Sequence, residues 1–338
     1  MPEGNFSCAD LVVVSNKMEQ MWADSVVQKQ YTPQANSALA VLTEQTAQFI
    51  DLKNSLKDVD VRIEWIDHCA GGVTDCTDEC SITGTEAQAT CEDYAISICK
   101  ETEFVVKDLT FRTSSFSREE VTARGWMNSL KRLDEEIAKT VVAKIDSFAG
   151  VNPYVGGIGN VVGTDTFVSG AYWTAEIMSY LAQVSILNKS QDVYILDGDN
   201  LFQQTWMAQY NQANANGGSQ IGMLSSIRKY FDLFNVNAVV GAKKTFLIDK
   251  GAVALISKVR YPSTPEQILN GANVIRWSVP SNYLPNIAYD VVYQTECSGS
   301  DIFHKYKFIA RFDVFLNPTS ACDTTNTGVL SFTCGEAP

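Results

Sequence analysis

The strongest enzyme-like pattern in the sequence is a pair of aspartates, Asp197 and Asp199, that follows a short apolar run. A DxD sequence in a loop after a strand can bind a divalent cation and a sugar-nucleotide diphosphate, because hard cations prefer carboxylate oxygens. This reading predicts a metal-dependent glycosyltransferase. The alternative is structural: Asp199 would cap a helix beginning at Asn200. The pattern is only three residues long and no phosphate-binding loop accompanies it, so the cap is favoured.

The two histidines, His68 and His304, are the only candidates for an imidazole base. His304 lies in an alternating apolar pattern, where an imidazole is typical of a packed or surface residue. His68 adjoins Cys69, but neighbouring residues on a strand point to opposite faces, so the two are poorly placed as a catalytic pair. The sequence therefore favours a protein without an active site, and no cofactor is expected.

Five of the nine cysteines fall within one segment of about 30 residues, namely Cys69, Cys76, Cys80, Cys91 and Cys99. Only Cys76 and Cys80 have the spacing of a zinc-ligand pair. Disulfides are a second possibility, and free thiols acting as small apolar groups are a third. On one extended strand Cys91 and Cys99 would lie about 26 Å apart, beyond the ~7 Å limit for bridged Cα atoms. Each would need a partner in residues 69–80 or on another subunit.

Composition narrows the class of protein. The 338 residues are 45% hydrophobic and 19% charged, which is typical of a globular chain. A net charge of -13 argues against nucleic-acid binding through a broad basic surface. We expect no membrane association, because no segment approaches the ~20 apolar residues of a transmembrane helix. The N-terminus lacks the features of a signal peptide, so we expect folding in the cytoplasm.

The longest helical signal covers residues 117–150. Ser117 and Glu120 form a capping box, and Gly150 is expected to close the helix in a left-handed conformation. One apolar stripe follows at steps of three and four residues: Trp126, Leu130, Leu133, Ile137, Val141, Ile145 and Phe148. Charge pairs four residues apart, such as Arg132 with Glu136, predict a solvated opposite face.

The elements before this helix are less regular. Residues 1–33 are expected to form an extended arm, and residues 36–56 show a moderate helical pattern. Alternating apolar residues from Val59 to Trp65 and from Tyr94 to Ile98 predict two strands joined by a long polar loop. Such a hairpin is marginal alone in water, so we expect it to lie on another surface, such as a second subunit.

After the long helix, the glycine-rich residues 151–163 mark a domain boundary. A helix is expected near residues 172–187, a buried strand at 193–196, and two apolar runs at 245–248 and 252–256 with Gly251 at the turn. Strands are expected at 289–293 and 306–314, with Lys305, Lys307, Arg311 and Asp313 on an outer face. Residues 319–338 are expected to be a polar tail.

The order of these elements resembles the tailed-phage major capsid proteins of the Hong Kong 97 type, over almost the whole chain. The resemblance rests on the hairpin at 59–112, the helix at 117–150, the stretch 246–256 and the strands at 289–318. It implies an α+β capsid fold with an extended N-terminal arm, a long hairpin called the E-loop, a spine helix in a peripheral domain, and a mixed α/β axial domain. The implied subunit is not an enzyme. Encapsulin shells share the fold, and the sequence does not distinguish the two.

The resemblance implies five parts: an arm at 1–56, the hairpin at 57–115, a peripheral domain at 116–155 with 286–318, an axial domain at 156–285, and a tail at 319–338. The implied partners are further copies in hexamers and pentamers, and portal, scaffolding and decoration proteins. The shell would enclose double-stranded DNA without reading its sequence. The shell would assemble in the host cytoplasm and would finally be the capsid of the virion. Outside the cytosol, its hairpin thiols could oxidise. A virion protein without this fold is a further alternative.

Overall fold

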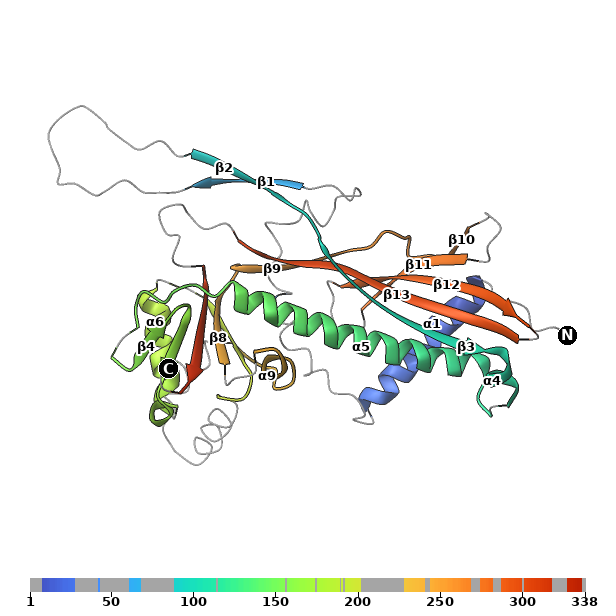
Figure 1. The fold of residues 1–338 in the computed structure, drawn as a ribbon, viewed down its shortest axis with the longest axis horizontal. Coiled ribbons are helices and arrows are strands. Elements are labelled where there is room, and N and C mark those ends of the chain that lie inside the picture. Colours follow the sequence, from blue (N-terminus) through green and yellow to red (C-terminus); the bar gives the residue numbers. More distant parts are fainter. Residues whose placement is uncertain are drawn as a thin grey trace.

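The structure is a computed structural model. It describes residues 8–27, 42, 61–67, 88–113, 115–155, 157–173, 175–188, 190, 192–201, 228–240, 244–268, 274–281, 287–299, 301–317 and 327–335. The molecule is elongated: a long helix runs beside one β-sheet, a second sheet lies at one end, and a two-stranded hairpin projects beyond the body (Figure 1).

The long helix, α5, spans Arg118–Ser147, which is about 45 Å at 1.5 Å per residue. The predicted capping box is confirmed, because Ser117 Oγ accepts the Glu120 N–H and the Glu120 carboxylate accepts the Ser117 N–H. The C-terminal prediction is wrong. The helix ends at Phe148 in a right-handed conformation, and Gly150 donates its N–H to Val329 of the end sheet.

The sheet beside α5, here called the central sheet, has the order β10-β11-β12-β13-β3. Strand β9 pairs with the C-terminal half of β13, whose N-terminal half pairs with β12. A tight turn joins β12 and β13, with Gly299 at a φ of 67°. The strands are β3 (Ile98–Lys107), β9 (Val253–Lys258), β10 (Glu266–Ile268), β11 (Val274–Pro280), β12 (Ala288–Ser298) and β13 (Asp301–Leu316).

The second sheet, here called the end sheet, has the order β4-β5-β14-β8-β6-β7. Its strands are β4 (Gly159–Val162), β5 (Asp165–Val168), β6 (Val193–Asp197), β7 (Arg228–Phe231), β8 (Lys244–Asp249) and β14 (Val329–Cys334). The expected helix is present as η2 (Gly170–Tyr172) and α6 (Ala175–Leu187). Two short helices complete the described body, α4 (Asp108–Thr113) and α9 (Asn235–Val240).

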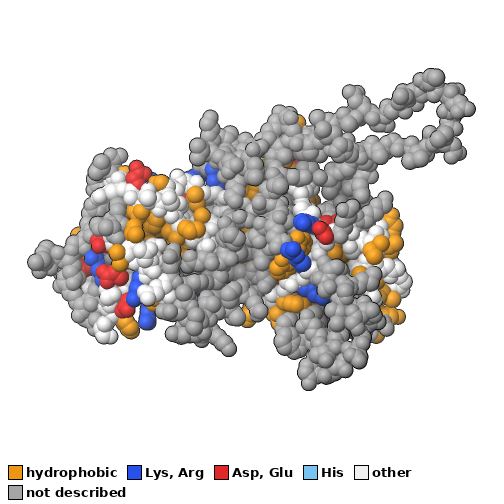
Figure 2. All heavy atoms as spheres, turned by 180° about the vertical axis from the view of Figure 1, so that it is seen from behind, with side chains coloured by type: hydrophobic (Ala, Val, Ile, Leu, Met, Phe, Trp, Pro, Cys, Tyr) orange, Lys and Arg blue, Asp and Glu red, His pale blue; other side chains and the backbone are white. Residues whose placement is uncertain are grey.

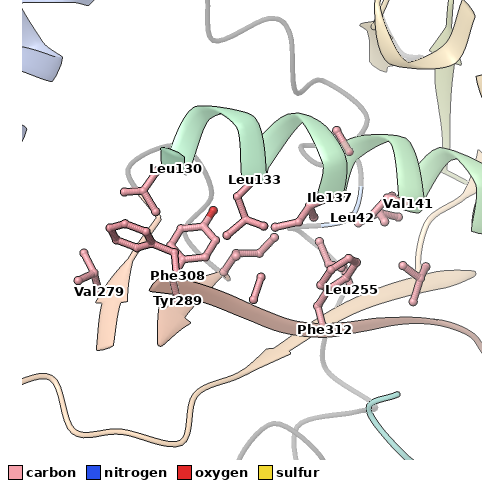
Figure 3. Close-up of a cluster of buried hydrophobic side chains, with 14 of the residues drawn as sticks. Leu42, Leu130, Leu133, Ile137, Val141, Leu255, Val279, Tyr289, Phe308 and Phe312 are labelled. Atoms are coloured by element: carbon pink, nitrogen blue, oxygen red, sulfur yellow. The ribbon is translucent and has the colours of Figure 1, made fainter. Parts of the chain in front are cut away.

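The main hydrophobic core lies between α5 and the central sheet. Figure 3 shows Leu130, Leu133 and Ile137 reaching from α5 toward Tyr289 and Phe308 on the strands. The same core continues into one face of the end sheet, while the opposite face of that sheet packs against α6 in a second cluster. The predicted apolar stripe is therefore the contact surface that joins the helix to the sheet.

Gly125 lies where α5 packs against β3. A Cβ atom at this position would lie 2.5 Å from the Phe104 ring, which itself stacks on Tyr306 with ring centroids 4.7 Å apart. Gly125→Ala should therefore lower the free energy of unfolding by about 1 to 3 kcal/mol through overpacking, although alanine has the higher helix propensity. Urea unfolding would measure this, with Ala143→Gly at an exposed position of α5 as the propensity control. Stabilisation by Gly125→Ala would contradict the close packing.

Two expectations about the chain ends are wrong. Within the supposed extended arm, Cys8–Val27 form a helix, α1, that packs on α5. Its buried residues Leu11, Val14 and Met18 have helical spacing, a signal obscured by the polar residues around them. Within the supposed polar tail, β14 lies inside the end sheet, parallel to β5 and antiparallel to β8.

The turn predicted at Gly251 is present, with a φ of 85°, and the strands that flank it, β8 and β9, do not pair with each other. One belongs to the end sheet and the other to the central sheet, so this turn links the two sheets. Asp313, expected on an outer face, is almost fully buried because it holds the base of the hairpin. The helix predicted at 36–56 lies outside the described residues, except for the buried Leu42.

Candidate assembly interface

The projecting hairpin consists of β1 (Val61–Asp67) and β2 (Gln88–Tyr94), paired antiparallel with Val61 opposite Tyr94. The hairpin prediction is confirmed, although its second strand begins earlier than expected. Residues 95–97 interrupt the strand, and the chain then continues as β3 in the central sheet. The two strands form a sheet of their own, which Figure 1 shows beyond the body. A sheet of two strands is marginal in water.

The base of the hairpin is attached to β13 at a defined point. Asp313 Oδ2 accepts hydrogen bonds from the Ser97 N–H, at 3.0 Å, and from Ser97 Oγ, at 2.7 Å. Lys144 of α5 lies 3.9 Å from the other oxygen. Beside these bonds Tyr94 and Ile96 pack against Phe315, with the Tyr94 and Phe315 rings edge to face. These contacts fix the direction in which the hairpin leaves the body.

Ser97→Ala should loosen this attachment. The variant loses one hydrogen bond to a carboxylate, which contributes about 1.5 to 3 kcal/mol when charged, while the backbone N–H bond remains. Amide hydrogen exchange should become faster in β2, whereas α5 should keep its protection. The matched control is Ser147→Ala, because Ser147 Oγ donates to Lys144 O at an exposed helix end. Unchanged exchange in β2 would show that the backbone bond and the Tyr94 contact suffice.

The two candidate metal ligands are not equivalent. Asp197 is fully buried, and its carboxylate accepts the Leu201 N–H at 2.8 Å and Thr245 Oγ1 at 2.5 Å. Asp199 is exposed. Both oxygens of Asp197 are thus engaged inside the protein, which does not favour a chelating pair. The backbone N–H that follows Asn200, that of Leu201, donates to Asp197. The helix that Asp199 was expected to cap lies outside the described residues.

His304 is buried in a polar cluster between β13, β12 and α4. Its Nδ1 lies 2.8 Å from Tyr293 Oη, its Nε2 lies 2.9 Å from Asp108 Oδ1, and Arg118 is 3.5 Å away. Burial lowers the pKa of His304, and the nearby Arg118 lowers it further, against the opposing effect of Asp108. Of the two expectations for this imidazole, a packed or a surface residue, the structure shows the packed one. His68 lies outside the described residues.

The described cysteines form no disulfide with one another: Cys91, Cys99 and Cys297 are exposed, and Cys334 is half-buried. Cys91 and Cys99 lie on two strands, β2 and β3, rather than on one strand as expected. Cys69, Cys76 and Cys80 lie outside the described residues, so the disulfide and zinc possibilities stay predictions. Across the described part of the chain, no group of three or more His, Cys, Asp or Glu side chains could hold a metal ion.

Sequence reasoning missed the buried carboxylic acid of α5. Asp134 is 1% exposed and accepts a hydrogen bond from the Tyr289 hydroxyl of β12. Burial is the main reason that its pKa rises to about 7. The signal was present, because residue 134 follows Leu130 by four and precedes Ile137 by three, which places it on the apolar stripe.

The junction between α5 and the end sheet was also missed. Lys244 of β8 lies 2.8 Å from Asp146 of α5 and 3.0 Å from Asp165 of β5. Partial burial lowers the pKa of Lys244, but its bonds to the two carboxylates outweigh this and raise it overall. The three residues are far apart in sequence, so no local pattern could reveal the bridge.

Exposed hydrophobic residues gather toward both ends of the body on the face shown in Figure 2. Across the described surface the largest exposures include Phe234, at 73%, and Ile186, at 65%. None of the described helices is long and apolar enough to cross a membrane.

The sequence matches no protein-family description and no curated protein. Solved structures are similar in fold. A chain of the cyanophage A-1(L) capsid asymmetric unit is 13% identical, with 86% of this chain and 93% of that chain covered and a TM-score of 0.50. A chain of Mycobacterium phage Che8 is 12% identical, with coverages of 87% and 90% and a TM-score of 0.47. A chain of Mycobacterium phage Adephagia is 10% identical, with coverages of 90% and 91% and a TM-score of 0.46. The cyanophage similarity, over nearly the full length of both chains, shows that this chain has the α+β fold of a tailed-phage capsid protein.

Proposed function

We propose that this chain is the major capsid protein of a tailed bacteriophage and that its copies close an icosahedral shell around double-stranded DNA. The observation that carries the proposal is the projecting hairpin on a capsid fold. A two-stranded sheet outside the body gains stability when a neighbouring subunit covers it, and interfaces of permanent assemblies bury thousands of Å².

In this proposal the chain acts through its interfaces and is not an enzyme. Hexamers and pentamers would be its working forms, with portal, scaffolding and decoration proteins as further partners, and the virion as its final location. The hairpin is the E-loop, α5 is the spine of a peripheral domain at 116–155 with 286–318, and residues 156–285 form the axial domain.

Electron microscopy tests the proposal. The protein expressed alone and particles isolated from its source should both show closed polyhedral shells, and the source particles should contain double-stranded DNA. Shells filled with protein cargo would instead indicate an encapsulin-like compartment. Monomers in both preparations would contradict a shell protein.

Substituting the buried Asp197 and the exposed Asp199 one at a time distinguishes a structural role of these two residues from a catalytic role. Asp197→Ala should lower the free energy of unfolding by about 3 kcal/mol, because it leaves the Thr245 hydroxyl and the Leu201 N–H without their buried acceptor. Asp199→Ala should change it by less than about 0.5 kcal/mol and leave assembly intact. Urea unfolding and microscopy would measure both. Manganese-dependent binding of a sugar nucleotide that is abolished by Asp199→Ala would instead support the glycosyltransferase hypothesis.

A further inference from the structure

One end of α5 is joined to the rest of the molecule by a set of polar side chains, here called the His304 cluster. It consists of Asp108 of α4, Arg118 in the first turn of α5, Tyr293 of β12 and His304 of β13. Asp108 is 4% exposed, and Tyr293 and His304 are each 1% exposed. The cluster lies at the end of α5 remote from the end sheet, where the chain passes from β3 through α4 into the helix (Figure 1).

Helix α4 is anchored by a charged side chain rather than by an apolar one. Among its side chains that the structure describes, Leu109 and Thr110 are exposed and only Asp108 is buried. The helix packs on β13, and the Asp108 carboxylate lies 2.9 Å from Nε2 of His304 on that strand. In the described part of α4, this contact is therefore the side-chain attachment of the helix to the sheet.

The partners of His304 indicate which ring nitrogen carries its hydrogen. An ionised carboxylate can only accept a hydrogen bond, so Nε2 donates to Asp108. Nδ1 then accepts from the Tyr293 hydroxyl, at 2.8 Å. The residues paired with His304 on the adjacent strands, Thr295 and Val106, carry no charge. A neutral imidazole thus uses both of its nitrogens in this site.

A second proton on His304 would disturb the cluster. Nδ1 would become a donor and could no longer accept the Tyr293 hydroxyl bond. Arg118 Nη2 lies 3.5 Å from Nε2, so an imidazolium would place two positive charges side by side where water is excluded. Asp108 favours the added proton, but burial and Arg118 outweigh it and lower the pKa of His304. The neighbouring Tyr306 stays protonated, because burial raises its pKa.

We propose that the His304 cluster is an acid-operated latch: uptake of one proton by His304 releases α4 and the first turn of α5 from β12 and β13. Histidine has an ordinary pKa of 6.5, so below this pH the opened form takes up the proton while the closed form resists it. Opening therefore becomes more favourable as pH falls, by up to about tenfold per pH unit, the limit for one proton. Acid would thus change the chain between β3 and α5 without disrupting the main core.

NMR of the imidazole ring tests the cluster directly, because the chain has only two histidines. In His68→Gln the remaining signal belongs to His304, and its titration midpoint should lie below 6.5. Asp108→Asn should lower the midpoint further and Arg118→Gln should raise it, because the carboxylate favours the added proton and the guanidinium opposes it. A midpoint at or above 6.5, or one that neither substitution moves, would overturn the proposal.

Amide hydrogen exchange between about pH 7.5 and about pH 5 tests the release itself. Protection of α4, corrected for the intrinsic rate at each pH, should fall in the original protein and in the control His68→Gln. It should stay constant in His304→Gln, because a glutamine amide can donate to Asp108 and does not take up a proton in this range. The middle of α5 should keep its protection, since the raised pKa of Asp134 makes the core more stable at lower pH.

Two exchange results would overturn the latch: unchanged α4 protection while His304 titrates, or an acid-induced loss that persists in His304→Gln. If His304→Gln did not fold, constant α4 protection in the original protein would still contradict the proposal, whereas a loss confined to α4 together with the lowered midpoint would support it. The latch lies within one subunit and goes beyond the proposed shell function. Its failure would leave that function intact, and a failure to form shells would leave the latch intact.

Discussion

Trp126→Ala should lower the free energy of unfolding by about 3 to 5 kcal/mol, the range for removing a buried aromatic side chain. Trp126 is fully buried where α5 meets the central sheet, with its ring centroid 5.5 Å from Trp277 and 5.6 Å from Phe308. Its indole N–H has no hydrogen-bond partner in the described structure, so the loss comes from packing.

Urea or thermal unfolding of the unassembled subunit would measure this loss. Asn128→Ala on the exposed face of α5 is the control, and it should change stability by less than about 0.5 kcal/mol. If both variants had the same small effect, the contact between helix and sheet would not be the main core. A large loss confined to Trp126→Ala would establish that the spine helix is held by its apolar stripe.

Asp134→Asn should remove a pH dependence of stability that the unmodified protein shows between about pH 4 and pH 7. The pKa of Asp134 is about 7 in the folded protein and 3.8 in its ordinary environment. As pH rises through this window, the unfolded chain ionises while the folded chain keeps its proton. Stability therefore falls with rising pH, by up to about 4 kcal/mol in total, and the loss is complete above the folded-state pKa.

Asparagine has nearly the shape of the protonated acid and can still accept the Tyr289 hydroxyl bond. The variant should therefore match the original protein near pH 4 and exceed its stability at pH 8. Urea unfolding across this range would measure the difference. Glu135→Gln removes the neighbouring half-buried carboxyl and should keep most of the slope. A slope that survived in Asp134→Asn would assign the pH dependence to other groups.

Local sequence patterns were sufficient to predict several helices, strands and turns. The capping box and the spacing of Leu130, Leu133 and Ile137 specify α5, because a helix needs only neighbours three and four residues away. Alternation specifies β12 and β13 in the same way, and glycine at a positive φ specifies their turn. The order of such elements was enough to indicate the capsid fold, which the structure and the cyanophage comparison confirm.

Other features depended on partners distant in sequence. The polar C-terminal segment contains β14 because β5 and β8 offer it hydrogen bonds on both sides, and α1 is a helix because α5 covers Leu11 and Val14. The separation of β8 and β9 into different sheets has no local signature, since each run is apolar and of strand length.

The sequence by itself determined the long helix, the hairpin, most strands and the distribution of charge, because periodicity, capping and composition are local properties of the chain. Only the tertiary structure decided which charges are buried or paired. It placed Asp134 against Tyr289, bridged Asp146 to Asp165 through Lys244, and left Arg132 exposed opposite the covered face of α5. The physical reason is that burial and ion pairing depend on contacts between residues that packing, and not sequence proximity, brings together.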